Sequence, residues 1–390
     1  MVSICQSAEG DIVDQEVLDL PPELFSHLRA PSGQWASCIR LLSPFEGETL
    51  QRIDLTQNEA AFSVSTIVFH NQPDVTYLAV GTGVDVTVIP RQCRKGFIHL
   101  YKFSEDGTSL EFVHKTEVND IPQVMIPFHN RLLVGVGSAL RIYDMGKRKL
   151  LRKSEAKGFP RAIVSLHTQG NRIVVGDLQE SVHFVTYLPM ENRLIIFADD
   201  TTTRYTTATA IIDYDTVVGG DKFGNLFVNR LPSDVSDQVE DDPTGNRLVY
   251  ERGYLHGSSH KLKNLTNYHV GDTVTAIEKA TLVAGGRDIV LYTTLGGAVG
   301  ILVPFVSRDD VEFFQTMELH MRNEAPPLCG RDHLAYRSSY IPVKNVIDGD
   351  LCEYFNALPL AKKQAIADEL DRTPSEITKK LEDIRTLVAF

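Results

Sequence analysis

The sequence predicts an all-β fold with a small α-helical appendage: a WD-like β-propeller of six to seven blades over residues 1–306, followed by a C-terminal helical domain over residues 307–390. Three observations predict this fold. A phrase of apolar residues, a glycine and further apolar residues returns along the chain, its copies recur with a period typical of propeller blades, and helical periodicity begins only after the last copy.

Each copy of the returning phrase reads as a strand, a glycine turn and a second strand. Val, Ile, Leu, Tyr and Phe fill the apolar runs, and Gly, Asn and Asp separate them, as in short strands joined by tight turns. One glycine from each copy, taken as an anchor, gives spacings of 54, 41, 43 and 66 residues. A propeller blade typically has roughly 40 to 50 residues. We expect the anchor glycines to supply positive φ in the hairpins. The copies are residues 76–88, 131–145, 171–187, 216–231 and 281–303, and the anchors are Gly81, Gly135, Gly176, Gly219 and Gly285.

The predicted number of blades rises to six or seven because two further segments resemble parts of a sheet. Residues 37–55 read as another hairpin, and residues 334–343 read as a further strand. Two stacked sheets would also contain hairpins, but a sandwich does not impose a returning period of this length. A doubly wound α/β fold would need helices between the strands, and almost no helical pattern occurs before residue 306. The repeats therefore favour a closed all-β ring.

The widest anchor spacing contains a polar and acidic segment flanked by proline, residues 232–248. This composition is typical of a solvated loop. Two interpretations of its acidic part, residues 234–242, stay open: the tip of an extended hairpin, which is favoured, and an electrostatic docking site.

Helical periodicity begins near residue 307, and its clearest signal lies at the C-terminus. Thr373 is expected to cap a helix, Pro374 to occupy its first turn, and Glu376 to complete a capping box. An apolar stripe on this helix is most simply the face that packs on the chain's own core, with a partner helix as the second interpretation. Apolar residues at helical spacing are Phe314, Met317 and Met321 in the first helix and Ile377, Leu381, Ile384 and Val388 in the last.

Motifs that carry catalysis are not found. No GxGxxG follows a strand, and GxxxxGK[ST], GxSxG and HExxH do not occur. His256 and His260 have a metal-like spacing, but they lie in a polar segment without a nearby third ligand, which favours an ordinary exposed loop. We therefore expect no catalytic residue, no metal site, no cofactor and no small-molecule substrate.

Two further polar clusters read more simply as structural caps than as sites. Residues 329–333 (CGRDH) contain a thiol, a carboxylate and an imidazole, but members of a triad must converge in space rather than in sequence. Asp348, Asp350 and Glu353 have a spacing that resembles a calcium loop, without the later ligands of an EF-hand. Either Asp348 or Asp350 is expected to start the helix that bears Leu351 and Phe355.

Composition limits the class of protein. The chain has 390 residues, 43% hydrophobic and 23% charged, which is typical of a soluble globular protein. No run approaches the roughly 20 apolar residues of a membrane helix, and no signal peptide is indicated. The five scattered cysteines, without a CxxC pair, fit a reducing compartment. A net charge of −12 disfavours direct, dominant nucleic-acid binding.

Four strings of residues resemble a known family. They are residues 221–232 (DKFGNLFVNRLP), 267–274 (NYHVGDTV), 328–358 (LCGRDHLAYRSSYIPVKNVIDGDLCEYFNAL) and 369–386 (ELDRTPSEITKKLEDIRT). They resemble the family of large propeller subunits that comprises the splicing factor 3b, cleavage and polyadenylation specificity, and damaged-DNA-binding adaptor branches. The YRS and IDGDL elements are common to the family, whereas LCGRDH and ELDRTP indicate the splicing branch.

The resemblance implies three propellers and a helical C-terminal domain in the family protein, of which this chain corresponds to the third propeller and the terminal helices. We therefore expect Met1 to mark an engineered or excised start. The acidic residues 234–242 depart from the family pattern. The resemblance further implies a non-catalytic scaffold in the nucleus, within the U2 snRNP, that supports branch-site recognition during pre-mRNA splicing.

The partners implied by the resemblance are the HEAT-repeat subunit and the small helical subunits of the splicing factor 3b complex, with an indirect or weak RNA contact and no membrane contact. The alternative function is that of an adaptor in a cullin ubiquitin ligase or in the cleavage and polyadenylation machinery. A propeller enzyme would instead need convergent acids or a bound metal.

The candidate interface residues rest on where loops should lie. Residues 199–210 are a threonine-rich connection, and we expect it to expose Arg204 and Tyr205, a pair of residue types enriched at interface centres. The next turn and the turn one blade later are expected to share that face, although an unengaged surface loop is an equally open interpretation of each. The candidate interface residues are Thr203, Arg204, Tyr205, Thr206, Lys222, Phe223, Arg287 and Asp288.

Overall fold

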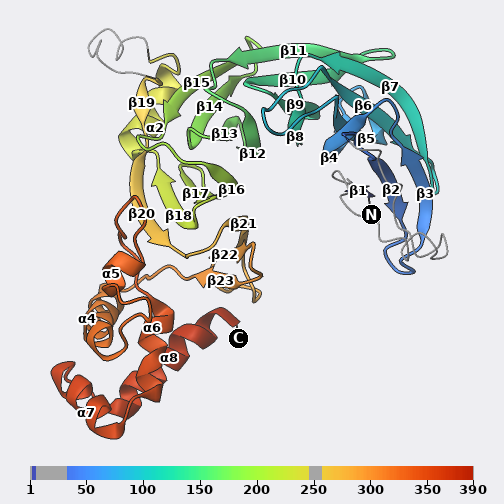
Figure 1. The fold of residues 1–390 in the computed structure, drawn as a ribbon. Coiled ribbons are helices and arrows are strands. Elements are labelled where there is room, and N and C mark those ends of the chain that lie inside the picture. Colours follow the sequence, from blue (N-terminus) through green and yellow to red (C-terminus); the bar gives the residue numbers. More distant parts are fainter. Residues whose placement is uncertain (1, 6–32, 246–256, 390) are drawn as a thin grey trace. The chain divides into compact units, whose positions relative to one another are not determined.

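The protein is described from a computed structural model that places residues 2–5, 33–245 and 257–389. Its contacts divide the chain into two compact units, Met1–Phe197 and Ala198–Phe390, and each is described by itself. Antiparallel sheets make up the first unit, whereas the second contains sheets and a group of helices (Figure 1). The prediction of a mostly β, propeller-like chain with a small helical part is confirmed.

The first unit contains three sheets of consecutive strands and most of a fourth. The first sheet is β1 (Val2–Cys5), β2 (Cys38–Leu42) and β3 (Thr49–Asp54). The second is β4 (Glu59–Phe69), β5 (Gln72–Val84), β6 (Lys95–Phe103) and β7 (Leu110–Val118). The third is β8 (Pro122–Phe128), β9 (Arg131–Val136), β10 (Ala139–Met145) and β11 (Leu150–Lys157). The fourth is β12 (Ile163–Gln169), β13 (Arg172–Asp177), β14 (Val182–Leu188) and β15 (Arg193–Asp199).

The second unit contains two further sheets. The last residues of β15, Ala198 and Asp199, pair in parallel with β19 (His260–Lys261). One sheet is β16 (Thr206–Asp213), β17 (Thr216–Asp221), β18 (Asn225–Arg230) and β20 (Lys263–His269), and the other is β21 (Val274–Ala280), β22 (Ile289–Thr294) and β23 (Val299–Leu302). Six sheets therefore lie within the described residues, in agreement with the lower of the two predicted blade numbers.

Within each unit the sheets pack through their first strands, as blades do around a propeller axis. β4 packs against β8, β8 against β12, and β16 against β21. Apolar side chains fill the space between sheets: Leu132 and Val134 with the second sheet, Leu133 and Leu140 with the fourth. This arrangement repeats one antiparallel meander, which is why one sequence phrase returns.

Glycines in the second strand of a sheet let the next sheet come close. A Cβ at Gly81 would lie 2.5 Å from the carbonyl oxygen of Pro122, and a Cβ at Gly135 would lie 2.6 Å from Cγ2 of Ile163. The same relation recurs in the second unit, where a Cβ at Gly220 would lie 2.6 Å from Cβ of Val274. Any side chain at these positions would push two packed sheets apart.

Four of the five anchor glycines, all except Gly285, do not have the positive φ expected of them. Gly81, Gly135 and Gly219 lie inside strands without positive φ, and of the five anchors only Gly285 has it, at +76°, in the connection before β22. The turns use other residues, such as Gly137 at +54° and Gly224 at +81°. Residues 76–88 accordingly do not form a hairpin, because β5 continues through Gly81 to Val84.

The buried carboxylate of Glu59, on β4, contacts side chains from the other three strands of its sheet. The side chain of Glu59 is 4% exposed, and it accepts hydrogen bonds from Nζ of Lys115 at 2.9 Å and from the hydroxyl of Thr82. Nε2 of His99 lies 2.6 Å from Oε1, the oxygen that Thr82 also contacts, whereas Lys115 contacts Oε2. Burial raises the pKa of Glu59, but these hydrogen bonds outweigh it and lower the pKa to about 2.

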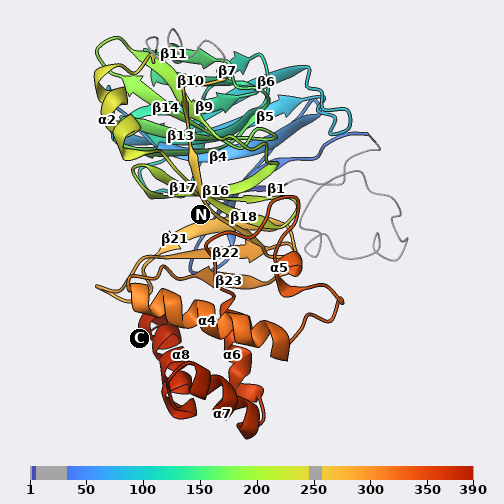
Figure 2. The same ribbon diagram turned by 90° about the vertical axis from the view of Figure 1, so that its left-hand side faces the viewer.

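Apart from α2 (Ser233–Asp241), which lies between β18 and β19, the helices of the second unit follow the last strand, β23 (Figure 2). They are α4 (Arg308–Glu324), α5 (His333–Tyr336), α6 (Gly349–Glu353), the 3-10 helix η2 (Tyr354–Ala357), α7 (Leu360–Glu369) and α8 (Pro374–Ala389). The predicted capping box of α8 is confirmed: the amide of Thr373 donates to Glu376 at 2.7 Å, and the amide of Glu376 donates to the Thr373 hydroxyl at 3.3 Å. The helical core contains Phe314, Met317, Met321, Leu351, Cys352, Phe355, Ile377 and Leu381, with Ile384 packed against it.

The stripe of α8 thus packs on the chain's own helices, as the favoured interpretation predicted. The side chain of Val388, its last member, lies outside the described residues.

Two segments differ from the predictions. Residues 232–248 were expected to form a loop, but α2 (Ser233–Asp241) forms there, because Val239 is buried and Ser236 donates to Oδ1 of Asp215 at 2.8 Å. Residues 334–343 form no strand: Asp332 caps α5 by accepting from the Leu334 amide at 3.1 Å, so the chain starts a helix instead.

The division into a propeller, residues 1–306, and a helical domain, residues 307–390, stays a prediction. Secondary structure changes from strand to helix between Leu302 and Arg308, but the contacts divide the chain after Phe197.

Replacing Gly135 by valine is expected to reduce the free energy of unfolding by about 1 to 3 kcal/mol, because the new side chain overlaps Ile163 and Val124. The matched variant is Gly107→Asn, since Gly107 has φ +71° and open space around its Cβ position. Asparagine tolerates this backbone region, so a cost below about 1 kcal/mol is expected. Urea unfolding of both variants measures the difference, and equal losses would contradict the close-approach argument.

Glu59 is expected to make stability depend on pH. Because its pKa is lowered to about 2 in the folded chain, its contribution is present above the unfolded value of 4.5 and is lost as pH falls toward 2. A shift of this size corresponds to about 3 kcal/mol. Urea unfolding between pH 7 and pH 2 should show this loss in the wild type and not in Glu59→Gln. The exposed Glu46→Gln is the control, and its pH profile should match the wild type; an unchanged profile in Glu59→Gln would refute the assignment.

Candidate functional site

Two connections of the second unit meet at one end of the sheet β16, β17, β18 and β20. Thr206, at the start of β16, pairs with Asp221, at the end of β17. The connection before β16 and the turn after β17 therefore lie side by side, and the amide of Lys222 donates to the carbonyl of Tyr205 at 3.0 Å. Tyr205 and Lys222 are therefore neighbours at this end of the sheet, while their part in an interface stays a prediction.

Asp221 fixes the turn between β17 and β18. Its buried carboxylate accepts from the amides of Phe223 at 2.8 Å and Asn225 at 2.9 Å, and from the side-chain amide of Asn225 at 2.9 Å. Gly224 takes the left-handed conformation that closes the turn. The turn is held by its own aspartate, and Phe223 projects from it.

Three aromatic side chains form a continuous exposed row on this end of the sheet. Tyr205 and Phe223 lie edge to face with their ring centroids 5.7 Å apart, and Phe223 and Tyr340 do so at 5.9 Å. They are 37%, 48% and 50% exposed. Nζ of Lys222 lies 3.7 Å from the Tyr205 ring centroid and 4.9 Å from that of Phe223. We call Tyr205, Lys222, Phe223 and Tyr340 the aromatic platform.

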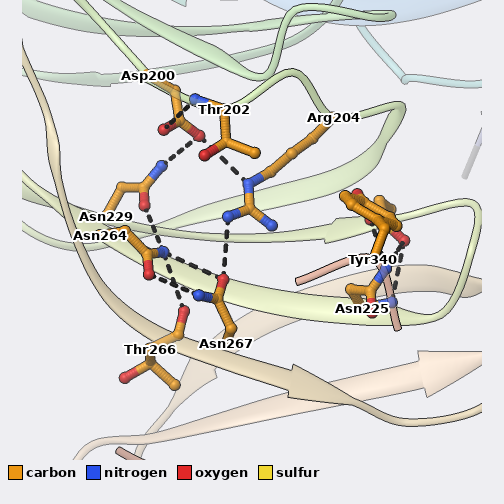
Figure 3. Close-up of polar contacts among 10 residues, drawn as sticks. Asp200, Thr202, Arg204, Asn225, Asn229, Asn264, Thr266, Asn267 and Tyr340 are labelled. Carbon is orange, nitrogen blue, oxygen red and sulfur yellow. Dashed lines mark hydrogen bonds and ion pairs between the residues drawn. The ribbon is translucent and has the colours of Figure 1, made fainter. Parts of the chain in front are cut away.

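Arg204 lies in a buried polar network beside the aromatic platform (Figure 3). Its Nε donates to Oδ2 of Asp200 at 3.3 Å, and its Nη2 donates to Oδ1 of Asn267 at 2.9 Å. The guanidinium also lies over the ring of Phe227, 4.3 Å from its centroid. The side chains of Arg204 and Asp200 are at most 1% exposed. This buried ion pair holds the connection that carries Tyr205 in place.

Asparagines extend this network to the neighbouring strands. Asn229 donates to Oδ2 of Asp200 at 2.7 Å and accepts from Asn264 at 3.0 Å, and Asn264 exchanges two side-chain hydrogen bonds with Asn267 (Figure 3). The network thereby ties the connection before β16 to β18 and β20. Nη1 of Arg204 is buried without a hydrogen-bond partner within the described residues.

Tyr340 reaches the platform from a segment far away in sequence. Residues 337–344 run along β20: the amide of His269 donates to the carbonyl of Arg337 at 3.1 Å, and Asn267 and Lys344 exchange backbone hydrogen bonds. Between these two attachments, the Tyr340 hydroxyl donates to Oδ2 of Asp221. Burial, and then this hydrogen bond to a carboxylate, raise the pKa of Tyr340, so the phenol stays protonated. The same aspartate thus holds two of the three rings.

The structure corrects the expected exposure of Arg204 and Thr206 and the expected location of Arg287 and Asp288. Arg204 is 1% exposed and Thr206 is 2% exposed, so the predicted exposed pair reduces to Tyr205, whereas Thr203 is exposed beside it. Arg287 and Asp288 lie between β21 and β22. Asp288 is held 2.8 Å from Nζ of Lys279, which donates to the carbonyl of Ile212 at the far end of the sheet.

In a meander, the connection between the first and second strands lies at the opposite end of the sheet from the connection between the second and third strands. Arg287 and Asp288 are in a connection of the first kind, between β21 and β22, whereas Phe223 is in one of the second kind, between β17 and β18. The expectation that Arg287 and Asp288 share the face of Phe223 is therefore wrong. Their role as interface residues, like that of the platform residues, stays a prediction.

Sequence reasoning missed Tyr340 as a member of this surface. The segment that contains it is predicted as a further strand and belongs to one of the family strings, but its hydrogen bond to a turn 119 residues earlier depends on tertiary contacts. The YRS string that begins at Tyr336 marks this segment as part of the family pattern. The sequence contains no pattern that shows where the segment lies in the fold.

The other polar candidates have structural contacts. Cys329 is exposed and Asp332 caps α5, while Nε2 of His333 lies 2.9 Å from Asp348. Asp348 caps α6, as one of the two predicted starts, and Arg337 donates to it at 2.6 Å. His256 lies outside the described residues.

Across residues 2–5, 33–245 and 257–389, no group of three or more His, Cys, Asp or Glu side chains is arranged to hold a metal ion. No helix in the same ranges is long and apolar enough to cross a membrane.

A family model described as the CPSF A subunit region matches residues 36–357, which include both the sheet of the aromatic platform and the segment that supplies Tyr340. The chain belongs to the CPSF A subunit region family. This match covers well over half of its length, and it confirms the resemblance that the sequence strings indicated.

Three splicing proteins are similar to the chain along almost all of its length. It is 53% identical to splicing factor 3B subunit 3 of Danio rerio over 372 residues, 51% to pre-mRNA-splicing factor RSE1 of Mycosarcoma maydis over 369, and 50% to spliceosome-associated protein 130 A of Arabidopsis thaliana over 370. Each comparison covers 95% of this chain but only 31%, 30% and 30% of the relative. The chain spans about a third of the length of these relatives.

Replacing Arg204 by methionine is expected to reduce the free energy of unfolding by about 3 to 5 kcal/mol, because it removes one member of the buried ion pair with Asp200. The matched variant is Arg230→Met, whose partner Asp213 and own side chain are each 51% exposed, with an expected cost below about 1 kcal/mol. Adding Asp200→Asn to Arg204→Met should recover part of the loss. Chemical denaturation gives all three values, and equal costs for the two arginines would contradict the role of the network.

Proposed function

We propose that the chain is a non-catalytic interaction scaffold of the splicing factor 3b complex, acting in the nucleus within the U2 snRNP in support of branch-site recognition and pre-mRNA splicing. Its partners in this proposal are the HEAT-repeat subunit and the small helical subunits of that complex. The relatives named as splicing factors support the assignment to this branch. A cullin-ligase adaptor or a polyadenylation subunit would share the fold, but no relative reported above carries such a name.

The aromatic platform is the observation that carries the interaction role. Tyrosine and phenylalanine supply large contact areas, and a rigid aromatic loses little conformational freedom when a partner covers it. The platform is rigid because Asp221 holds both the Phe223 turn and the Tyr340 hydroxyl, and because Arg204 fixes the connection that bears Tyr205. Its exposed row of rings is a surface that a protein partner would cover.

The charge of the chain supports protein rather than RNA as the direct partner. The net charge is −12, and Lys222 is the one cation of the platform. A surface that tracks phosphates needs several cations along the strand. In this proposal any contact with RNA is therefore indirect or weak.

The proposal also treats the described residues 307–389 as a helical domain that follows the propeller.

Replacing Tyr205 and Phe223 together by alanine is expected to weaken binding to the purified HEAT-repeat and small helical subunits about tenfold or more, because two hot-spot side chains are lost. Stability should fall by less than about 1 kcal/mol, since both rings are on the surface. Titration of a labelled chain with the assembled partner subunits measures the dissociation constant.

The control for this double variant is Phe45→Ala, at a turn residue of the first unit that is 97% exposed, which should bind within about twofold of the wild type. The cullin scaffold serves as a partner that should not bind at all. Unchanged affinity of the double variant would reject the platform as the contact surface, and binding of the cullin scaffold in place of the splicing subunits would reject the splicing assignment.

A further inference from the structure

The connection between β5 and β6 is a second projecting element, in the first unit. It spans residues 85–94, whereas the commonest hairpin connections have about two residues. A long connection that keeps a defined shape within a compact sheet is often functional.

The base of this connection is tightly anchored. The side chain of Asp85 accepts from Nδ2 of Asn58 at 2.9 Å and forms an ion pair with Arg94 at 3.1 Å. The carbonyl of Val86 accepts from Nε1 of Trp35 at 2.7 Å, and the Val86 side chain is 7% exposed. The lower half of the connection therefore behaves as part of the sheet.

The upper half is closed by its own hydrogen bonds. Thr87 and Gln92 exchange backbone hydrogen bonds of 3.0 and 3.1 Å, and the Thr87 hydroxyl donates to the carbonyl of Pro90 at 2.7 Å. These bonds close residues 87–92 into a defined turn. The shape is set before any partner arrives, which reduces the entropy lost on binding.

The tip that this scaffold presents is apolar. Val88 is 65% exposed and Ile89 is 92% exposed, and Pro90 follows them on the surface. Single exposed aliphatic residues are common on protein surfaces, but two adjacent ones on a pinned turn form a small protruding knob. Each would gain from transfer into an apolar pocket.

The basic residues of this connection indicate the charge of the partner. Residues 85–95 contain Arg91, Arg94 and Lys95 against the single carboxylate of Asp85, in a chain that has 51 acidic and 39 basic side chains. Arg94 pairs with Asp85 and Lys95 pairs with Glu117. Arg91 is exposed beside the knob, and this leaves a cation next to an apolar tip.

We propose that Val88, Ile89 and Arg91 form a docking knob that inserts into a protein partner with an apolar pocket edged by carboxylates. The knob is a second contact surface of the scaffold, separate in sequence from the aromatic platform, and in this respect it rests on the proposed function. A protein pocket is favoured over single-stranded RNA, because aliphatic side chains offer no face on which bases stack. It is favoured over a lipid surface, because stable membrane binding needs a larger apolar area or several cations.

The test measures the affinity of the full chain for the assembled HEAT-repeat and small helical subunits of the splicing factor 3b complex. Ile89→Asp should weaken binding at least about tenfold, and Arg91→Glu should weaken it severalfold and reduce its salt dependence. The matched controls are Phe45→Asp, at a turn residue that is 97% exposed, and Lys147→Glu, on an exposed turn. Both controls should bind as the wild type does.

The outcomes separate this proposal from the proposed function. If the wild type binds, the platform variant Tyr205→Ala with Phe223→Ala weakens binding, and Ile89→Asp does not, the knob is rejected while the scaffold stands. If the wild type does not bind the splicing subunits, both are rejected. Two further arms use vesicles of phosphatidylcholine with phosphatidylserine, and a single-stranded oligouridine. Binding to either that depends on Ile89 would reject the protein pocket in favour of that ligand.

Discussion

The close approach of neighbouring sheets is the constraint on which the rest of the structure depends. Gly81, Gly135 and Gly220 each lie in the second strand of a sheet, at a point where even a methyl group would lie only 2.5 or 2.6 Å from an atom of the next sheet. Because the sheets approach so closely, their apolar faces bury one another and each connection emerges at a defined place at the end of a sheet. The packing of the sheets therefore fixes where each turn projects from the protein.

The aromatic platform shows what such positions allow. In most surface loops a row of exposed rings would be mobile, but here Asp221 binds the turn and the Tyr340 hydroxyl together, and the ion pair of Arg204 and Asp200 fixes the adjoining connection. The buried arginine is therefore a positioning residue, and the surface residues are the rings that it holds in place. The same few polar contacts stabilise the fold and hold the exposed rings in place. The pattern of apolar and polar residues along any one strand does not predict these contacts.

Much of the fold could be predicted from the sequence because it rests on local patterns. The strand pairs at residues 131–145 and 171–187, the capping box of Thr373 and Glu376 and the buried stripe of α4 all follow from periodicity and cap chemistry. The roles of the glycines could not be predicted, since the sequence does not distinguish a glycine needed for φ from one needed for space. The burial of Arg204, the contribution of Tyr340 and the location of Arg287 depend on tertiary packing and strand order, which a single sequence does not contain.

The central claim is that a protein partner covers the aromatic platform, and hydroxyl-radical footprinting of its side chains tests this most directly. The chain would be oxidised alone and in complex with the HEAT-repeat and small helical subunits, and the rate at each residue read by mass spectrometry. We expect the rates at Tyr205, Phe223 and Tyr340 to fall together in the complex, while Tyr354, 58% exposed among the helices, keeps its rate. Unchanged rates at all three platform rings in a complex that has formed would contradict the account.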